Sequence, residues 1–290
     1  MKNNPFHETI SGVFEIKLKD YFLTQEEFII RKNQTFGFLE TYPQPIDNLA
    51  RYYESEAYIS HSDSTKGLFA RLYQFVKFIN LRRKFSMLDT PKKNAKILDY
   101  GCGTGDFLAY AKNKKLNVLG VEPNLKARQI AAQKIGKENV LSSDLNEIHQ
   151  TFDIITLWHV LEHIPNIFEF LEELKNHLKP GGEIIIAVPN HLSYDAKFYK
   201  EFWAGYDVPR HLWHFSPESM QKLLQRFGMK IEKTQPLWFD SFYVSLLSER
   251  YKKTKLGFIR AVWVGALSNI MGVFSKNYSS VVYKVRKIKN

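Results

Sequence analysis

Hydrophobic residues along this chain of 290 residues follow two periods, and the switch between them marks the predicted elements. From Lys96 onward, short apolar runs of strand length are separated by stretches whose apolar residues recur three and four positions apart, as in a helix. The predicted strands cover 96–100, 117–121, 139–141, 152–157, 183–190, 229–234 and 281–285. Among the helices between them, one has Asn124 as its predicted N-cap, and another has Leu178 as its last apolar position before a predicted turn at 179–182. Strands that alternate with helices predict an α/β fold, in which helices cover both faces of a mostly parallel sheet.

The first 64 residues predict a strand-rich segment, because apolar residues alternate at 14–18 and again at 28–31. The spacing of apolar residues over 68–85 predicts a helix. This helix begins the main domain, which is predicted to cover 65–290. The chain is long enough for one large domain with a smaller segment attached.

A predicted strand runs directly into a glycine-rich loop in the stretch 97–108, ILDYGCGTGDFL. Its glycines, Gly101, Gly103 and Gly105, let the backbone approach a ligand and reach positive φ. The helix that follows offers free N–H groups and a partial positive charge, at the place where open α/β sheets bind ligands. The spacing G-x-G-x-G lacks the third glycine of a pyrophosphate fingerprint, and Asp106 stands there instead. An acid beside the loop disfavours a pyrophosphate and favours a cationic ligand.

An acidic residue stands at the end of the next predicted strand. Glu122 lies 21 residues after Gly101, and a carboxylate at that place accepts hydrogen bonds from both ribose hydroxyls of a nucleotide. The loop and this acid together predict a nucleotide-type cofactor. An NAD-dependent oxidoreductase is the first alternative, and the glycine spacing and Asp106 argue against it.

The charge balance is strongly basic, with a net charge of +11 and a pI near 9.4. Lys and Arg concentrate at 82–84, 92–93, 252–255 and 284–289 without a nucleic-acid-binding motif, so we expect no nucleic-acid partner. These runs are interpreted as solvated faces, with an anionic acceptor or lipid headgroups as the alternative. Cys102 is the only cysteine, which excludes an intrachain disulfide, and no signal peptide is recognised; we therefore expect a cytoplasmic protein.

The pattern Asp99-x-Gly101-x-Gly103-x-Gly105 resembles the first motif of class I S-adenosylmethionine-dependent methyltransferases, and the resemblance covers about 96–190. Downstream residues resemble the subgroup of ubiquinone-biosynthesis O-methyltransferases and their bacterial relatives. The resemblance implies a Rossmann-like, doubly wound sheet of seven strands with an antiparallel last strand. It also implies S-adenosylmethionine as the cofactor and methyl transfer to a small-molecule acceptor, with a hydroxyl oxygen preferred.

The resemblance also assigns cofactor-binding roles by position. It implies that the three loop glycines approach the amino-acid tail of the cofactor, and that Asp99 holds the loop and the ammonium group of that tail. Glu122 then binds the ribose, and Asp144, in the loop after the third strand, accepts the adenine amino group. Further positions implied to line the cofactor site are Cys102, Pro123, Leu145, Trp158 and His159.

Four histidines and an arginine are the candidates for chemistry on the acceptor. They are His159, His163, Arg210, His211 and His214. The first two lie in the run 158–165, which resembles a family signature ending in Leu-Glu-His; the others lie in an insertion over 191–215, which resembles a Pro-Arg-His segment over the substrate mouth. A histidine accepts a proton from a hydroxyl near neutral pH, and an arginine pairs with a carboxylate or phosphate.

Each of these candidates also has a structural interpretation. The histidines are then packing or capping residues, and the insertion is a loop held by its own Arg and His hydrogen bonds. Glu162 and His163 are adjacent, as in a metal-binding pair, yet we expect no metal. Tyr58 and His61 precede the main domain, and they either contact the cofactor or substrate or cap a core edge.

Relatives in the subgroup often carry a small zinc ribbon near the N-terminus, and the resemblance fails there. Where a Cys-x-x-Cys pair would precede Gly37, this chain has Asn33 and Phe36. A structural zinc site needs four Cys or His ligands. We therefore expect a ribbon-like remnant without zinc, in which apolar packing replaces the metal.

A second insertion, 238–278, contains the nearly apolar stretch Leu256–Phe274, 19 residues long. This length approaches that of a membrane span, but Arg260 and the return of the chain to the sheet argue against crossing. We interpret the stretch as a helical lid over the active site, with a helix on the membrane surface as the alternative. The second rival function is accordingly a non-catalytic membrane-surface binding protein. The methyl acceptor and the oligomeric state stay open.

Overall fold

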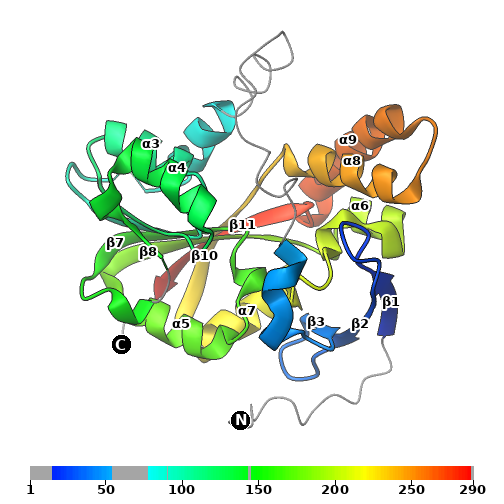
Figure 1. Cartoon of the computed structure of the whole chain (residues 1–290), viewed down its shortest axis with the longest axis horizontal. Coiled ribbons are helices and arrows are strands. Elements are labelled where there is room, and N and C mark those ends of the chain that lie inside the picture. Colours follow the sequence, from blue (N-terminus) through cyan, green and yellow to red (C-terminus); the bar gives the residue numbers. More distant parts are fainter. Residues whose placement is uncertain (1–14, 54–77, 90, 143–144, 289–290) are drawn as a thin grey trace. The chain divides into compact units, whose positions relative to one another are not determined.

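The computed structural model describes residues 15–53, 78–89, 91–142 and 145–288, which form two compact units (Figure 1). Unit 1 comprises the chain up to Tyr53, Leu161–Ile167 and Ala187–Lys284, and unit 2 comprises the remaining segments. Neither unit is one continuous stretch of sequence. The predicted boundary near residue 64 stays a prediction.

Unit 2 contains the parallel strands that the apolar runs predict. These are β4 (Lys96–Tyr100), β5 (Asn117–Val121), β6 (Val140–Leu141) and β7 (Phe152–Trp158). The helices between them are α3 (Asp106–Asn113) and α4 (Leu125–Ile135), and α5 (Ile167–Asn176) follows. Helices α3 and α4 lie on one side of these strands and α5 on the other (Figure 1). Because both faces are covered, central residues such as Leu98 and Ile155 are fully buried.

The complete main sheet has seven strands in the order β10-β11-β8-β7-β4-β5-β6. The strands not yet named are β8 (Leu178–Pro189), β10 (Met229–Pro236) and β11 (Ser280–Lys287). With its antiparallel last strand, this order confirms the predicted Rossmann-like α/β fold. Strand β4 pairs with β5 on one side and with β7 on the other, so the loop after β4 lies at a topological switch point, where such sheets bind ligands.

The predicted and observed boundaries differ most around Leu178. This residue, predicted as the last apolar position of a helix, begins β8, and α5 ends at Asn176. The predicted turn at 179–182 belongs to the same strand, where Lys179 forms an ion pair with Asp153 of β7 at 2.8 Å. Long-range partners therefore extend this strand over residues whose local sequence favours a turn.

Two helices begin at polar caps that satisfy their free N–H groups. Asn124, the predicted N-cap of α4, accepts a hydrogen bond from the backbone N–H of Ala127 at 3.0 Å. Helix α7 (Pro217–Arg226) begins with a reciprocal capping box between Ser216 and Ser219. Local sequence therefore decides where these helices start.

Unit 1 contains a small antiparallel sheet in the order β1-β2-β3-β9. Its strands are β1 (Glu15–Lys19), β2 (Glu27–Lys32), β3 (Leu39–Tyr42) and β9 (Trp213–His214). The predicted N-terminal strands are thus present, and the 191–215 insertion supplies the fourth. A buried cluster joins the sheet to the insertion and to the C-terminal helices; it comprises Leu18, Phe28, Ile30, Leu39, Tyr52, Ala196, Tyr199, Trp203, Tyr206, Val208 and Val264.

Polar side chains hold the two tight turns of this small sheet. The carboxylate of Asp20 accepts hydrogen bonds from three backbone N–H groups of the turn that follows it. Asn33 accepts two, from Thr35 and Phe36, and its amide donates to the buried Glu40 at 2.6 Å. Apolar packing in place of a metal is the prediction for this segment, and in the structure hydrogen bonds to a carboxylate and an amide add to the apolar packing of the strands. The absence of zinc stays a prediction.

The remaining elements complete the description. They are α6 (Tyr194–Tyr199), α8 (Asp240–Lys252), α9 (Gly257–Ser275) and the short 3-10 helices η2 (Ile46–Tyr53), η3 (Lys137–Asn139), η4 (Leu145–Glu147), η5 (Leu161–His163), η6 (Lys200–Phe202) and η7 (Ala204–Tyr206). Helix α9 coincides with the predicted apolar stretch. Residues 78–86 are helical and form the end of the helix predicted over 68–85; Tyr58 and His61 lie outside the described residues.

Candidate active site

The loop after β4 places three glycines in the left-handed region, with φ of +74° at Gly101, +54° at Gly103 and +74° at Gly105. A β-carbon at Gly101 would lie 2.4 Å from Val160 Cγ2, and one at Gly105 would lie 2.9 Å from Ala131 Cβ. The first and third glycines therefore allow close packing of the chain. At Gly103, a β-carbon would meet no described atom within 4 Å, so this glycine faces open space.

Glu122 ties this loop to the end of β5. One of its carboxylate oxygens accepts a hydrogen bond from the Gly103 N–H at 2.8 Å, and the other accepts one from the Asn124 N–H at 2.9 Å. Burial raises the pKa of this carboxyl, and the two backbone hydrogen bonds oppose that shift. Each oxygen has further lone pairs, so the anchored carboxylate suits the predicted ribose contact.

Asp99 is a buried acid near the end of β4. Its carboxylate accepts a hydrogen bond from the Thr156 hydroxyl at 2.6 Å. Burial raises the pKa of Asp99 to about 7, while this hydrogen bond and the charge of Lys84 lower it. A carboxyl with this pKa releases its proton when a cation lies beside it. This property fits the role toward an ammonium group that the resemblance implies.

Asp106 is neutralised within the protein. Its carboxylate forms an ion pair with Lys134 at 2.8 Å and accepts a hydrogen bond from the Thr104 hydroxyl at 2.8 Å. The sequence argument that Asp106 itself favours a cationic ligand therefore loses its basis, and the residue stabilises the start of α3. Cys102, in the same loop, is buried, and burial raises the pKa of its thiol, so the thiol stays protonated. Its contact with the cofactor stays a prediction.

The end of β7 brings Trp158 and His159 to the sheet edge that carries the glycine loop. The ammonium of Lys84 lies 4.6 Å from the Trp158 ring centroid, and Phe107 packs edge-on against the same ring at 5.5 Å. The buried indole N–H has no hydrogen-bond acceptor among the described residues. Such a donor indicates a place for a ligand acceptor atom. His159 has a φ of +58°, a strained conformation that concentrates at functional sites.

The remaining predicted cofactor residues are Pro123, Leu145 and Asp144. The carbonyl of Pro123 accepts a hydrogen bond from Arg128 at 2.9 Å, which holds the start of α4. Leu145 is buried at the start of η4. Asp144 lies outside the described residues, so its contact with adenine stays a prediction.

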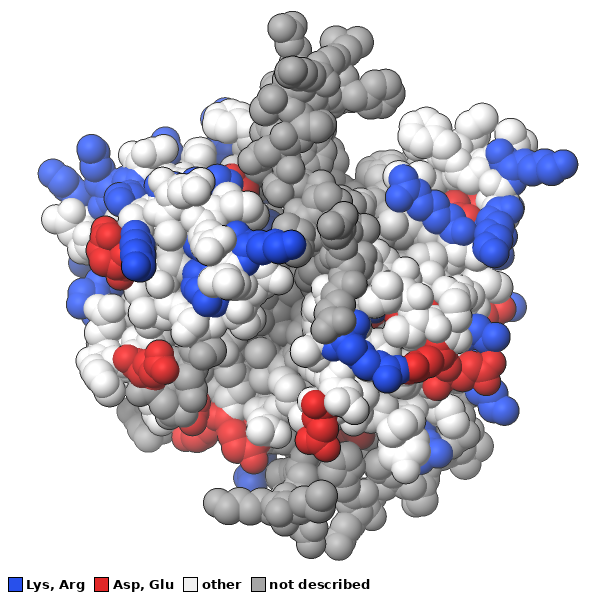
Figure 2. Space-filling view, in the orientation of Figure 1, with Lys and Arg blue, Asp and Glu red and all other residues white. Residues whose placement is uncertain are grey.

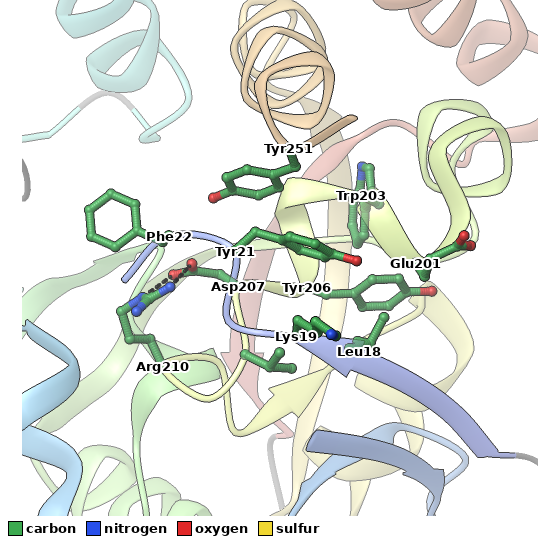
Figure 3. A pocket seen from close by; sticks show the side chains of 11 residues that line it. Leu18, Lys19, Tyr21, Phe22, Glu201, Trp203, Tyr206, Asp207, Arg210 and Tyr251 are labelled. Atoms are coloured by element: carbon green, nitrogen blue, oxygen red, sulfur yellow. Dashed lines mark hydrogen bonds and ion pairs between the residues drawn. The ribbon is translucent and has the colours of Figure 1, made fainter. Parts of the chain in front are cut away.

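Arg210 forms a buried ion-pair network in unit 1, and Figure 3 shows its guanidinium facing Asp207. It is 1% exposed and donates to Asp207 at 2.6 and 3.0 Å and to Asp20 at 2.9 Å. The Tyr52 carbonyl accepts a further bond at 3.1 Å, and the Phe22 ring lies 4.7 Å from the guanidinium. Arg210 therefore joins the N-terminal sheet to the insertion. This arrangement favours the structural interpretation over pairing with an anionic substrate.

Hydrogen bonds define the tautomers of two candidate histidines. His163 Nδ1 lies 2.9 Å from the Arg210 carbonyl oxygen, and His211 Nδ1 lies 2.9 Å from the Gly205 carbonyl oxygen. Since a carbonyl only accepts, these two contacts are hydrogen bonds only if both Nδ1 atoms carry the proton and both Nε2 atoms keep a lone pair. The Tyr53 hydroxyl, 3.0 Å from His163 Nδ1, then accepts from the same N–H. Burial lowers the pKa of His163 to about 4, and the adjacent His211 adds to the shift. His163 is therefore neutral near pH 7, with Nε2 as a proton acceptor.

His214 is a hydrogen-bond donor within unit 1. The Thr41 hydroxyl donates to the His211 carbonyl at 2.6 Å and lies 2.9 Å from His214 Nε2. Because the hydroxyl has a single proton, His214 Nε2 must donate to it. Burial holds the pKa of His214 well below its usual value, so the ring stays neutral. Its bonds match the packing histidine of the structural interpretation.

Glu162 completes a group that could hold a metal ion. Its carboxylate and the ring nitrogens of His163 and His211 place ligand atoms within 4.8 Å of one another. Each histidine donates its Nδ1–H to a backbone carbonyl, as metal-binding histidines do. The expectation of no metal stays a prediction.

Three residues that contact the candidate site residues were not predicted from the sequence; they are Thr156, Lys84 and Tyr53. Thr156 carries a detectable signal, because it is a hydroxyl residue within the apolar run of β7. Lys84 is visible only as part of a basic run. Tyr53, whose hydroxyl lies 3.0 Å from His163 Nδ1, carries no signal, because the two residues are 110 positions apart.

A small hollow in unit 1 lies beside Arg210 (Figure 3). It is lined by aromatic side chains, among them Tyr21, Trp203, Tyr206 and Tyr251. Its volume is about 230 Å³ with the space open to solvent included. Pockets for small molecules usually exceed about 300 Å³, so we interpret it as a gap in aromatic packing.

The sequence profile of a methyltransferase domain matches residues 36–234. The mitochondrial ubiquinone biosynthesis O-methyltransferase of Rattus norvegicus is 29% identical over 170 residues, which are 52% of this chain and 49% of that protein. The ubiquinone biosynthesis O-methyltransferase of Rickettsia typhi is 27% identical over 200 residues, 63% of this chain and 80% of that protein. The chain thus spans about half the length of the rat enzyme.

Solved structures with a similar fold are methyltransferase-type enzymes. A phosphoethanolamine N-methyltransferase of Haemonchus contortus has a TM-score of 0.55 at 15% identity, over 96% of this chain and 71% of that one. A mycolic acid cyclopropane synthase complexed with S-adenosylhomocysteine has a TM-score of 0.54 at 16% identity, over 83% and 94%. These likenesses support the fold alone. The profile match covers the glycine loop, Glu122 and the histidine cluster. The chain therefore belongs to the methyltransferase-domain family, as the resemblance of its glycine motif implies.

Proposed function

We propose that this enzyme transfers the methyl group of S-adenosylmethionine to a hydroxyl oxygen of a small-molecule acceptor. The observation that carries the proposal is the anchored Glu122 carboxylate, which holds the Gly103 and Asn124 N–H groups beside an open face of the loop. Similarity to O-methyltransferases within the matched domain supports an oxygen acceptor. The glycine spacing and the family disfavour the NAD-dependent alternative.

The residues at this sheet edge fit a nucleotide with a cationic tail. At Gly103 the loop leaves open space for the cofactor, and the Asp99 carboxyl, with a pKa of about 7, can ionise beside a cation. The Trp158 indole N–H, which has no acceptor in the part of the chain that the structure describes, offers a donor. When bound, the cofactor supplies an electrophilic methyl group on a positively charged sulfur. With the cofactor bound, Asp99 would face its ammonium group as a carboxylate, and Glu122 would accept hydrogen bonds from the ribose hydroxyls.

On the acceptor side, we assign His163 as the proton acceptor. The Arg210 carbonyl accepts its Nδ1–H, so the neutral Nε2 keeps the lone pair that a proton acceptor needs. His159 and His211 remain secondary candidates for this step. Arg210 and His214 act through positioning, because their polar atoms bond within the protein.

Titration calorimetry with S-adenosylhomocysteine tests the cofactor site. We expect Glu122→Ala to weaken binding by about 100-fold or more, since two hydrogen bonds to a charged group are lost and the loop is released. Glu122→Gln should bind S-adenosylhomocysteine with an affinity between those of the wild type and Glu122→Ala, because the amide keeps one acceptor oxygen. Glu147→Ala, which removes an exposed acid of η4, is the matched control. Unchanged affinity in Glu122→Ala, or binding of NAD instead, would overturn the assignment.

A screen of hydroxyl compounds with an isotope-labelled methyl donor tests the acceptor. With an active acceptor, His163→Gln should lower kcat by about 10²- to 10⁴-fold with little change in KM. His149→Gln, at an exposed position, should leave turnover unchanged. Methylation at nitrogen or carbon would reject the oxygen specificity while leaving methyl transfer intact.

We also propose a cytoplasmic location and no nucleic-acid partner. The proposal rests on the sequence having a single cysteine, so that the fold needs no intrachain disulfide and no oxidising compartment to form one. Cell fractionation with immunodetection checks the location. Recovery only from an oxidising compartment would reject it.

A further inference from the structure

Helix α9 carries its large apolar side chains on the exposed face. Phe258, Trp263 and Phe274 are 71%, 57% and 80% exposed. The other exposed apolar residues of this region are Leu256, Ile259, Val262, Ile270, Met271, Val273 and, on α8, Tyr243. The buried residues of α9 are small or of medium size: Ala261, Val264, Gly265, Ser268 and Gly272. A helix on a water-exposed surface shows the opposite pattern.

The small residues of α9 bring it close to its neighbours in unit 1. A β-carbon at Gly265 would lie 3.0 Å from Phe242 Cα of α8, and the Ser241 hydroxyl donates to the Gly265 carbonyl at 3.0 Å. The Ser268 hydroxyl donates to Asp195 of α6 at 2.5 Å. Small residues at a helix interface, with large apolar residues facing outward, are typical of helices whose outer face contacts lipid.

Although α9 is long enough to span a membrane, its contacts argue that it lies on a surface. It has 19 residues and a length of about 28 Å, which satisfies the length and composition of a span. Yet Val264 belongs to the buried cluster of unit 1, and Ser268 is bonded to Asp195. Just beyond the helix, Ser279 also donates to Asp195, at 2.7 Å. A helix that unit 1 holds at its middle and its end is not free to cross a bilayer.

The positive charge around α8 and α9 indicates that the surface they contact is anionic. Residues 250–290 contain ten Lys and Arg and no Asp or Glu. The basic residues at the turn between α8 and α9 and at the end of α9 are Arg250, Lys252, Lys253, Lys255 and Lys276. The acid just before this range, Glu249, is paired with Arg260 through two bonds at 2.6 and 2.7 Å. Figure 2 shows Lys and Arg side chains beside uncharged surface in the region of α8 and α9.

We propose that the α8–α9 region docks on the surface of a bilayer that contains anionic lipids. Phe258, Trp263 and Phe274 enter the boundary between headgroups and acyl chains, and the lysines of the turn contact the headgroups. The region lies outside residues 36–234, so it is separate from the part of the chain that the methyltransferase profile matches. The inference goes beyond the proposed function and does not depend on the methyl acceptor.

Vesicle flotation with the full chain tests this docking. We expect binding to vesicles of phosphatidylcholine with phosphatidylglycerol and weaker binding to phosphatidylcholine alone. The triple variant Phe258→Ser, Trp263→Ser and Phe274→Ser should lose at least about tenfold in partitioning, because the apolar area that enters the lipid is removed. Leu125→Ser on α4, which replaces another exposed apolar residue, is the matched control.

A charge variant separates the electrostatic contribution. Replacing Lys252, Lys253 and Lys255 with Ala should lower binding to anionic vesicles by at least about tenfold, since each basic residue near the surface contributes about fivefold. Its residual binding should also depend less on salt. Lys114→Ala and Lys115→Ala, at exposed positions after α3, should change binding little.

Two results would overturn the proposal. One is equal binding of the wild type and the triple variant, or no binding of either, with thermal unfolding showing that both are folded. The other is a dimer in light scattering that the triple variant dissociates, without vesicle binding by the wild type; that result would assign the apolar face to a second copy of the chain.

Discussion

The glycine loop of unit 2 and the Arg210 network of unit 1 both depend on buried carboxylates, but their partners come from very different distances along the chain. Glu122 and Gly103 are 19 residues apart, within one strand–loop–helix–strand unit. Arg210 and Asp20 are 190 residues apart. The loop can therefore be recognised as a motif, whereas the network exists only after the N-terminal sheet has packed on the insertion.

The two regions also differ in how their charges are compensated. Burial raises the pKa of Asp207, yet Arg210 more than offsets it, and the net pKa is lowered. At Asp99, burial prevails and the pKa rises to about 7. A buried acid with a complete cation partner stabilises the fold, whereas one with incomplete compensation is prepared for a cationic ligand.

Removing Arg210 should have the largest effect on stability. Arg210→Ala leaves the buried Asp20 and the partly exposed Asp207 without their cation, and we expect a loss of about 3–5 kcal/mol in the free energy of unfolding. Arg210→Lys should lose less, because the charge remains while the planar fork is lost. Urea unfolding followed by circular dichroism measures both. A variant of wild-type stability that binds cofactor but loses turnover would instead give Arg210 the substrate role first predicted for it.

The pH dependence of stability should identify Asp99. Its pKa in the folded state, about 7, lies above its unfolded value, so the folded state binds more protons between about pH 4 and 7. The contribution of this carboxyl to the free energy of unfolding therefore falls as the pH rises through that window, and it is constant above pH 7. A shift of three pKa units corresponds to a total loss of up to about 4 kcal/mol.

Asp99→Asn should remove the contribution of this carboxyl to the slope. Glu122, whose pKa burial also raises, keeps a contribution of the same sign. Urea unfolding at several pH values checks the difference, and bound S-adenosylmethionine should flatten the slope of the wild type. An identical slope in the variant would show that Asp99 is ionised throughout.

The loop glycines offer a third test, because two of them differ only in the space around them. Gly101→Ala should cost about 2–3 kcal/mol, since its methyl would lie 2.4 Å from Val160 Cγ2 and φ is positive. Gly103→Ala should cost about 1 kcal/mol, from positive φ alone. Its methyl would enter the open face, so cofactor affinity should fall. Adding Val160→Ala should recover part of the Gly101→Ala loss and none of the Gly103→Ala loss.

The smallest effects on stability are expected for two asparagines whose side chains accept backbone N–H groups, one in each unit. Asn124→Ala should cost about 1 kcal/mol, because α4 loses its N-cap. Asn33→Ala should cost about 1–2 kcal/mol, because it removes two turn hydrogen bonds and a donor to the buried Glu40. Thermal unfolding of the two variants provides the comparison. Equal stability of Asn33→Ala and the wild type would show that apolar packing alone holds the turn, as first predicted.

The elements of unit 2 could be predicted because their signals are local and strong. Strands β4 and β5 have the predicted bounds, and Asn124 caps α4 as expected. The main error, at Leu178, arises because pairing within the sheet overrides a local preference for helix and turn.

The sequence by itself determined which segments form strands and helices along the chain, the glycine loop and the acid that anchors it. Each of these depends on residues close together in the chain. It also carried the apolar stretch of α9 and the basic residues around it. Only the tertiary structure decided that Arg210 is buried against Asp20, that two histidines carry their protons on Nδ1 and that the large side chains of α9 face outward. These facts depend on desolvation and on partners far along the chain, which appear only when the backbone has folded.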